Sequence, residues 1–304
     1  MRVKQPPRAA PGRTQYLCKS HRVVVLAESY ILRFHFMKNR TFSALLLLAA
    51  PLALFSGCKK DSDTPATTGS VNFTVQNVVP ATNIVGVQPP QPLVLNTTTA
   101  TTTTGETFTV STFEYYLSNI KFTKSDGTTY AAPDTYFLVD QATPKSLSFT
   151  VPNVPAGDYT GVSFIVGVDA QKTGLTDPST FTGDLNQANN MYWTWNSGHI
   201  FMKLEGTLTS TSPAKALTCH IGGYTAPYNA IVTAAPSFSS NKLTVRADKA
   251  PTIALQANVT KLFDGPNPIT LSTFMGAHMP SAASVQIAQN YAAGLFTVTQ
   301  INTN

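Results

Sequence analysis

Short runs in which apolar and polar residues alternate constrain the fold of this chain more than any other feature of its sequence. Side chains of an extended strand point to its two faces in turn, so such a run predicts a strand with one buried face. The runs span residues 71–75, 108–111, 113–122, 146–151, 159–168, 199–208, 215–222, 242–247, 252–259 and 295–301. Many short strands between turn residues predict an all-β fold, an antiparallel β-sandwich with long loops.

Two insertions and one helical segment interrupt this pattern. Residues 97–104 are almost pure threonine and predict a solvated hairpin loop. Residues 169–192 contain Asp-Pro and Asn-Asn turn signals and predict a long loop, and long loops in compact domains are often functional. Residues 281–293 are rich in alanine and contain no proline, so we expect one short C-terminal helix there.

The N-terminal part of the chain is typical of an export signal. A basic stretch, residues 37–40, precedes an apolar run that is too short to span a membrane comfortably, and Ser-Gly-Cys58 follows it. This pattern predicts a lipoprotein signal peptide, residues 37–57, with lipid on Cys58; a plain signal peptide or a short buried helix is the alternative. Residues 1–36 fit no part of it and are interpreted as an upstream over-call of the start. The polar residues 58–69 then form a flexible tether, and residues 70–304 form the domain.

Removal of the export signal changes the net charge of the protein and, with it, the partners that we expect. The whole chain has 21 Lys and Arg residues and 15 Asp and Glu residues. Nine of the basic residues and one acidic residue precede Cys58, which leaves 12 and 14 in the mature chain. A chain that is slightly acidic offers no basic patch, so we expect no nucleic-acid partner. We expect an outer-membrane, periplasmic or cell-surface lipoprotein that touches the membrane only through its lipid.

Motifs of hydrolytic and nucleotide-binding enzymes do not occur in the sequence, and we expect no enzyme activity. There is no Gly-x-Ser-x-Gly, no His-Glu-x-x-His and no phosphate-binding glycine loop. Asp169, Asp177 and Asp184 are candidates for a calcium site, but their spacing is not that of an EF-hand.

Histidines offer the more informative ligands. In a hairpin of residues 199–208 and 215–222, His220 falls on the outward face and Cys219 on the opposite face. A register that closes the loop at residues 209–213 places His220 near Phe201, one diagonal step from His199. Two imidazoles at that separation could share one ion, and imidazole suits copper. A hydrogen-bonded sheet histidine remains the simpler interpretation of His220.

The remaining histidine, His278, lies between Met275 and Met279, which makes three soft or borderline ligands in five residues. We interpret it as a loop histidine with incidental methionines. Both tryptophans of the chain, Trp193 and Trp195, lie in residues 191–206, and they share one face if the segment is extended. A core pair that leads into an ordinary strand is the simplest interpretation of that block.

Six segments of the chain resemble, in order, the MbnP-like copper-binding protein family. They are residues 113–120, 136–140, 155–159, 166–169, 191–206 and 220–223, and Trp-Thr-Trp-Asn-Ser-Gly followed by Phe-Met-Lys-Leu-Glu-Gly is the most specific of them. The resemblance implies an exported protein that binds copper. It also implies that Trp193 or Trp195 is oxidised to kynurenine by a di-haem partner enzyme of the cytochrome c peroxidase type, and that this residue and His220 hold the copper.

The chain departs from the family pattern at two positions. Residues 73–77 lack the histidine that many members carry in the first strand, and His199 stands where tyrosine is more frequent. We expect His199 to compensate as a copper ligand, unless the chain has lost high-affinity binding. The alternative function is a surface adhesion or glycan-binding module with Trp193 and Trp195 as an aromatic platform, and a copper oxidase is a third, weaker hypothesis.

Overall fold

The computed structural model describes residues 67–80, 89–175, 177–196, 198–239 and 241–302. The predicted over-call, the signal peptide and Cys58 lie outside these residues, as does most of the tether. The first strand begins at Thr68, so the last two residues assigned to the tether belong to the domain. In the described part of the chain, no helix is long and apolar enough to cross a membrane.

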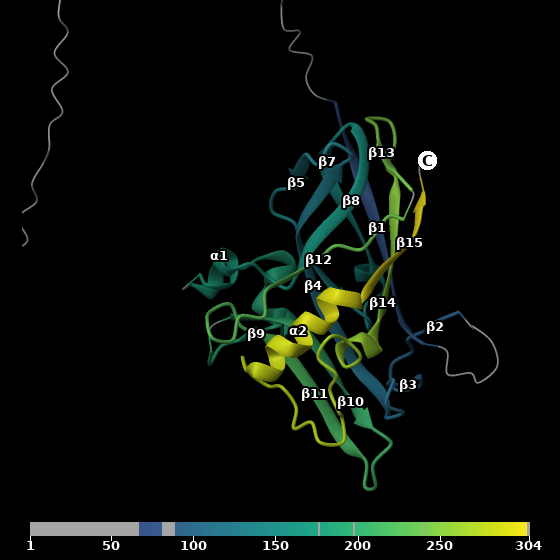
Figure 1. Cartoon of the computed structure of the whole chain (residues 1–304). Coiled ribbons are helices and arrows are strands. Elements are labelled where there is room, and N and C mark those ends of the chain that lie inside the picture. Colours follow the sequence, from purple (N-terminus) through teal and green to yellow (C-terminus); the bar gives the residue numbers. More distant parts are fainter. Residues whose placement is uncertain (1–66, 81–88, 176, 197, 240, 303–304) are drawn as a thin grey trace, which may run out of the picture. The chain divides into compact units, whose positions relative to one another are not determined.

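The described residues form two β-sheets (Figure 1). The smaller has five strands in the order β15-β14-β1-β2, and β7 also pairs with β1. Its strands are β1 (Thr68–Val79), β2 (Gln91–Pro92), β7 (Ser148–Pro155), β14 (Thr252–Asn258) and β15 (Phe296–Asn302). β1 and β14 are parallel, whereas the other pairs of this sheet are antiparallel. The parallel pair joins segments that are far apart in the sequence.

The larger sheet has ten strands in the described residues, and the order β11-β10-β4-β8-β12 forms its main path. Its strands are β3 (Thr99–Thr101), β4 (Thr107–Lys124), β5 (Thr129–Ala131), β6 (Tyr136–Asp140), β8 (Gly157–Val166), β9 (Tyr192–Trp193), β10 (Gly198–Leu208), β11 (Lys215–Gly222), β12 (Val232–Ala234) and β13 (Leu243–Val245). All of its pairs are antiparallel. The long strand β4 pairs with β10 along its first half and with β8 along its second half.

Aromatic rings from the two sheets meet between them. The ring of Phe73 in β1 lies 6.3 Å from that of Phe122 in β4, measured between centroids. Phe296 of β15 lies 5.7 Å from Tyr115 and 5.1 Å from Phe164. All five rings are buried. The predicted β-sandwich is therefore confirmed, and its core lies where the apolar faces of both sheets meet.

Short helices fill the connections. They are α1 (Ala170–Thr173), α2 (Ala282–Gly294) and the 3₁₀ helices η1 (Pro144–Leu147), η2 (Pro178–Thr180), η3 (Gly183–Leu185), η4 (Gln187–Asn189) and η5 (Val259–Leu262). α2 confirms the expected C-terminal helix and packs on β11, β12 and η5 (Figure 1). Its N-cap, Ser281, accepts a hydrogen bond from the backbone N–H of Ser284 at 3.2 Å.

The threonine-rich segment was wrongly expected to be a solvated loop. Residues 99–101 pair with β4 as β3, and Ala100 and Thr102 are buried. Thr103 is anchored to the remote Asp264 through its backbone N–H and its hydroxyl group, which donates at 2.7 Å. Threonine is compatible with a strand because its branched Cβ suits a pleated sheet, and these tertiary contacts decide the outcome.

β8 and β10 meet at Gly167, which directly follows β8. This glycine has φ +128°, and a Cβ there would lie 2.6 Å from the ring of Phe201. Phe201 is the extra residue of a bulge in β10, because the pairing with β11 shifts between Ile200 and Met202. The bulge and the glycine together let the two strands meet end to end beside β4.

Candidate functional site

His220 and its neighbours on β10 occupy one face of the larger sheet. His220 pairs with Lys203, and Cys219 pairs with Leu204. The predicted position of His220 near Phe201 is therefore wrong by two residues. In the structure the connecting loop takes in residues 209–214, and pairing begins with Leu208 opposite Lys215.

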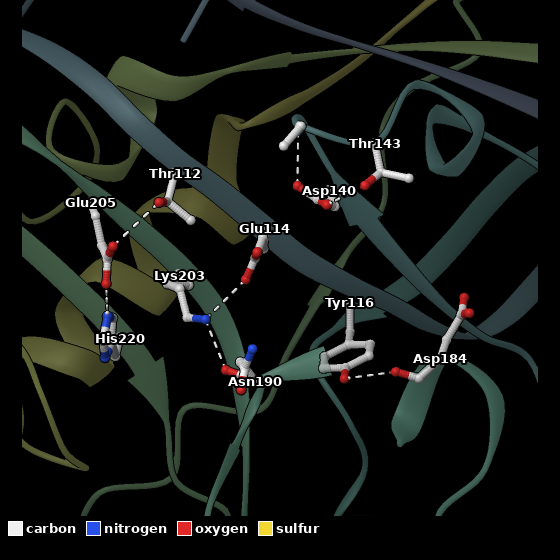
Figure 2. A network of polar contacts seen from close by, with 11 residues as sticks. Thr112, Glu114, Tyr116, Asp140, Thr143, Asp184, Asn190, Lys203, Glu205 and His220 are labelled. Atoms are coloured by element: carbon white, nitrogen blue, oxygen red, sulfur yellow. Dashed lines mark hydrogen bonds and ion pairs between the residues drawn. The ribbon is translucent and has the colours of Figure 1, made fainter. Parts of the chain in front are cut away.

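Glu205 holds the ring of His220 (Figure 2). His220 Nε2 donates to Glu205 Oε1 at 2.8 Å, and the hydroxyl group of Thr112 donates to Glu205 Oε2 at 3.2 Å. Burial works to raise the pKa of the Glu205 carboxyl group, but the hydrogen bonds from His220 and Thr112 hold it below its usual value. The carboxylate is therefore ionised and accepts from Nε2, so Nδ1 is the nitrogen of His220 that this contact leaves for a ligand.

His278 lies beside His220, although the sequence suggested an incidental loop residue. Ala277 forms a parallel bridge with Cys219, and it accepts a hydrogen bond from His220 N at 2.6 Å and donates one to Thr218 O at 3.0 Å. Cys219 and Ala277 are buried. The residue that follows each of them in its own segment, His220 or His278, therefore points to the other face. The two imidazole rings are 6.0 Å apart between centroids, at an angle of 75°.

His199 has no part in this pair. His199 precedes Lys203, the partner of His220, by four residues in β10. It is 1% exposed, and its ring packs against Tyr116, Phe181 and Tyr192. Thr173 Oγ1 accepts from His199 N at 2.8 Å and forms a hydrogen bond with Nδ1 at 3.1 Å. Nε2 then donates to the carbonyl of Leu185 at 3.2 Å.

Both ring nitrogens of His199 are therefore engaged, and the ring is neutral. Burial lowers the pKa of His199 from 6.5 to about 4, against a smaller opposing effect of the Leu185 carbonyl. The expected diagonal pair of His199 and His220 is not formed. His199 instead fixes the loop of residues 169–192 to the sheet, so it does not compensate for a missing copper ligand.

A largely buried ion pair lies next to the contact of His220 with Glu205 (Figure 2). Lys203 Nζ lies 3.0 Å from Glu114 Oε2 and donates to the carbonyl of Asn190 at 2.8 Å. Beside it, the hydroxyl group of Tyr116 donates to the carbonyl of Asp184 at 2.9 Å. These contacts attach the end of the 169–192 loop to β4 and β10.

The two tryptophans lie close together but in different surroundings. Trp193 in β9 is 5% exposed, Trp195 in the following turn is 61% exposed, and their ring centroids are 5.8 Å apart. The ring of Trp193 covers Gly222, where a Cβ would lie 2.7 Å from it. Because Trp193 is buried, the two rings do not form the exposed pair that a glycan platform requires. A pocket of about 160 Å³ adjoins Trp193 and is also lined by Tyr224 and Tyr228.

The three aspartates of the possible calcium site have separate structural roles. Asp169 caps α1 and accepts from the hydroxyl group of Tyr136. Asp177 caps η2, and Asp184 accepts from the backbone N–H of Leu138 at 2.8 Å. In the described ranges, no group of three or more His, Cys, Asp and Glu side chains is placed to hold a metal ion.

Residues 73–77 of the first strand, which lack the histidine of many family members, carry a buried amide at Asn77. Asn77 is 2% exposed, donates to Gln141 Oε1 at 2.8 Å and accepts from the hydroxyl group of Tyr115 at 2.8 Å. Tyr115 points to the face of the larger sheet opposite that of Glu114 and Lys203, because neighbouring residues of a strand alternate. Asn77 therefore lies on the opposite side of this sheet from His220.

The imidazole pair fits a transition-metal ion by its donor chemistry. A bound ion lies ~2.0–2.1 Å from a histidine nitrogen, so two rings on one ion have centroids roughly 5–6.5 Å apart. The 6.0 Å separation of His220 and His278 falls in this range. Cys219 is on the opposite face, and burial raises the pKa of its thiol well above the usual range, so it is no thiolate ligand here.

Comparison with known proteins identifies the family. The MbnP family model matches residues 68–281. The solved structure of MbnP from Methylosinus trichosporium is similar at 12% identity and a TM-score of 0.42, over 78% of this chain and 99% of that chain. No curated protein matches the sequence. The family match extends over more than half of the chain, from the first strand to the start of α2. The chain therefore belongs to the MbnP family.

Proposed function

We propose that this protein is an exported lipoprotein that binds copper, in copper acquisition or handling, and that it has no catalytic activity of its own. Membership of the MbnP family, over residues 68–281, supports a copper-related role. The observation that carries the proposal is the ring of His220, whose Nε2 is held by Glu205 at 2.8 Å, so that Nδ1 is the nitrogen turned to a ligand. Imidazole is a borderline donor that suits copper in protein sites.

Oxidation of a tryptophan to kynurenine is part of this proposal, with Trp195 as the residue that is oxidised. A partner enzyme has to reach the indole ring, and Trp195 is 61% exposed whereas Trp193 is 5% exposed. A di-haem enzyme of the cytochrome c peroxidase type would supply the oxidising equivalents. An intact indole has no basic lone pair for a metal, whereas the amine and the carbonyl group of kynurenine are donors.

Copper content and intact mass, measured on protein purified from its native host, test the proposal. We expect about one copper ion per chain, a mass shift that peptide mapping assigns to Trp195, and loss of copper in His220→Ala. His199→Ala is the matched histidine control and should keep its copper if it folds. Copper-free protein with two intact tryptophans, even after exposure to a di-haem oxidising partner, contradicts copper binding.

Lipidation is tested separately, because it depends on Cys58 alone. We expect metabolic labelling with a fatty-acid analogue to be lost in Cys58→Ala and retained in Cys219→Ala. Labelling that persists in Cys58→Ala contradicts the lipoprotein assignment and leaves the copper proposal untouched.

A further inference from the structure

We propose that His278 is the second imidazole ligand of the copper site and that Glu205 is a positioning residue for His220. The inference rests on the proposed copper binding and adds the ligands that hold the ion. Three separate chain segments contribute to it: β10 supplies Glu205, β11 supplies His220, and the segment before α2 supplies His278.

The backbone places the two rings on one face. Residue 277 forms a parallel bridge with residue 219. Residues 278 and 220, which come next in two segments that run in the same direction, therefore lie side by side. Hydrogen bonds on both sides of the bridge, His220 N to Ala277 O and Ala277 N to Thr218 O, fix this register. The pair is therefore set by backbone pairing, which gives two ligands a defined separation before any ion binds.

The hydrogen bond of Glu205 prepares His220 for coordination. Histidine ligands almost always donate their second ring N–H to a carboxylate, carbonyl or water, which fixes the tautomer and raises the basicity of the nitrogen that binds the metal. Glu205 accepts from Nε2 of His220 and is itself held by Thr112. The carboxylate need not be a direct ligand to matter for affinity.

Solvent access and nearby sulfur complete the site. The side chain of His220 is 21% exposed, and His278 is exposed. Met275 and Met279 flank His278 and are 91% and 52% exposed, an unusual position for large apolar side chains. Thioethers suit Cu(I), whereas water completes the coordination of Cu(II), so the remaining positions can serve either oxidation state.

Copper affinity, measured by competition with a chelator on the full chain, tests the ligand set. We expect His278→Ala and His220→Ala each to weaken binding by more than the roughly 10–100-fold that loss of an outer-shell partner causes. Glu205→Ala should weaken binding within that 10–100-fold range, and Glu205→Gln, which keeps an acceptor oxygen, should weaken it less. Thr273→Ala is the control for the exposed segment and should leave copper binding unchanged, because Thr273 is exposed and takes no part in the site.

A second readout separates coordination from folding. Electron paramagnetic resonance of the Cu(II) protein should show two equivalent imidazole nitrogens in the parent and one in His278→Ala, with unchanged circular dichroism. If the parent binds copper and His278→Ala binds it equally well, the inference is wrong and the proposed function stands. If the parent binds no copper in either oxidation state, with or without treatment by the oxidising partner, both are wrong.

Discussion

His199 and His220 lie on neighbouring strands of one sheet and differ in almost every physical property of their rings. His199 is sealed by the 169–192 loop, with both nitrogens in hydrogen bonds to protein groups and a pKa lowered by burial. His220 is partly exposed on β11, beside the segment around Ala277. The comparison teaches that the covering loop, rather than the strand, decides whether a histidine here supports the fold or is open to a ligand.

The tryptophans repeat this contrast over two residues. Trp193 belongs to the sealed region, since it covers Gly222, and Trp195 belongs to the open one. Substitutions in the sealed region should therefore change the free energy of unfolding, and those in the open region should leave it nearly unchanged. The predictions that follow use that difference, from the largest expected effect to the smallest.

Trp193→Ala should lower the free energy of unfolding by about 3–5 kcal/mol, because it leaves a cavity over β11. Trp195→Ala should change it by less than about 0.5 kcal/mol, as is usual for an exposed side chain. Chemical denaturation followed by circular dichroism measures both. Equal losses in the two variants would show that Trp195 is buried in solution and would remove the contrast.

Acid should destabilise the protein through His199. The folded-state pKa of about 4 is below the unfolded value, so the unfolded chain binds the proton first and stability falls as the pH drops from about 6.5 to about 4. Two and a half pKa units correspond to a loss of about 3 kcal/mol. The measurement is the free energy of unfolding against pH, in the parent and in His199→Ala.

Carboxyl groups also titrate in that range, so the difference between the two proteins is the informative quantity. The pH dependence of His199→Ala should be shallower than that of the parent by this amount. Parallel curves would mean that His199 is already accessible to protons in the folded state.

Gly222→Ala should lower the free energy of unfolding by about 1–3 kcal/mol, which is the usual effect of overpacking. The new Cβ would lie 2.7 Å from the backbone carbonyl of His199 and 2.7 Å from the Trp193 ring. Gly161→Ala is the control, because its Cβ would meet only Thr123, at 3.7 Å. A neutral Gly222→Ala would indicate that the ring of Trp193 moves freely away from β11.

His278→Ala should change the free energy of unfolding by no more than about 0.5 kcal/mol, although it is expected to abolish tight copper binding. The side chain is exposed, and the bridge at Ala277 uses backbone groups that the substitution keeps. Thermal unfolding without metal measures the stability. A large loss would place His278 among the structural residues.

Alternation in the sequence was sufficient for the longer elements. β4, β8, β10, β11, β14 and β15 lie where alternation predicted strands, and α2 lies within one residue of its predicted range. Strands of two or three residues, such as β2, β5 and β12, were missed because so short a stretch shows no period. Residues 97–104 were misjudged because threonine suits a strand and a loop alike.

The sequence predicted which face of the sheet carries His220, but it did not predict the residues that lie beside it. The parity of β11 correctly placed His220 on one face and Cys219 on the other, because alternation is a property of the strand itself. Hairpin register depended on the length of the loop at residues 209–214, and the guess was two residues off. The partnership of His220 with His278 had no signal in the sequence, because the bridge joins positions 58 residues apart.

What the sequence by itself determined are the local properties of this protein: which segments are strands, which faces they bury, and where the tryptophans and histidines lie along the chain. Tertiary structure alone decided which of them meet. The pairing of residue 277 with β11 brought His278 to His220, and the folding of Thr173 and Leu185 onto β10 closed the ring of His199. The physical reason is that side-chain alternation follows from the geometry of a single strand, whereas contacts between remote segments follow from how the whole chain packs.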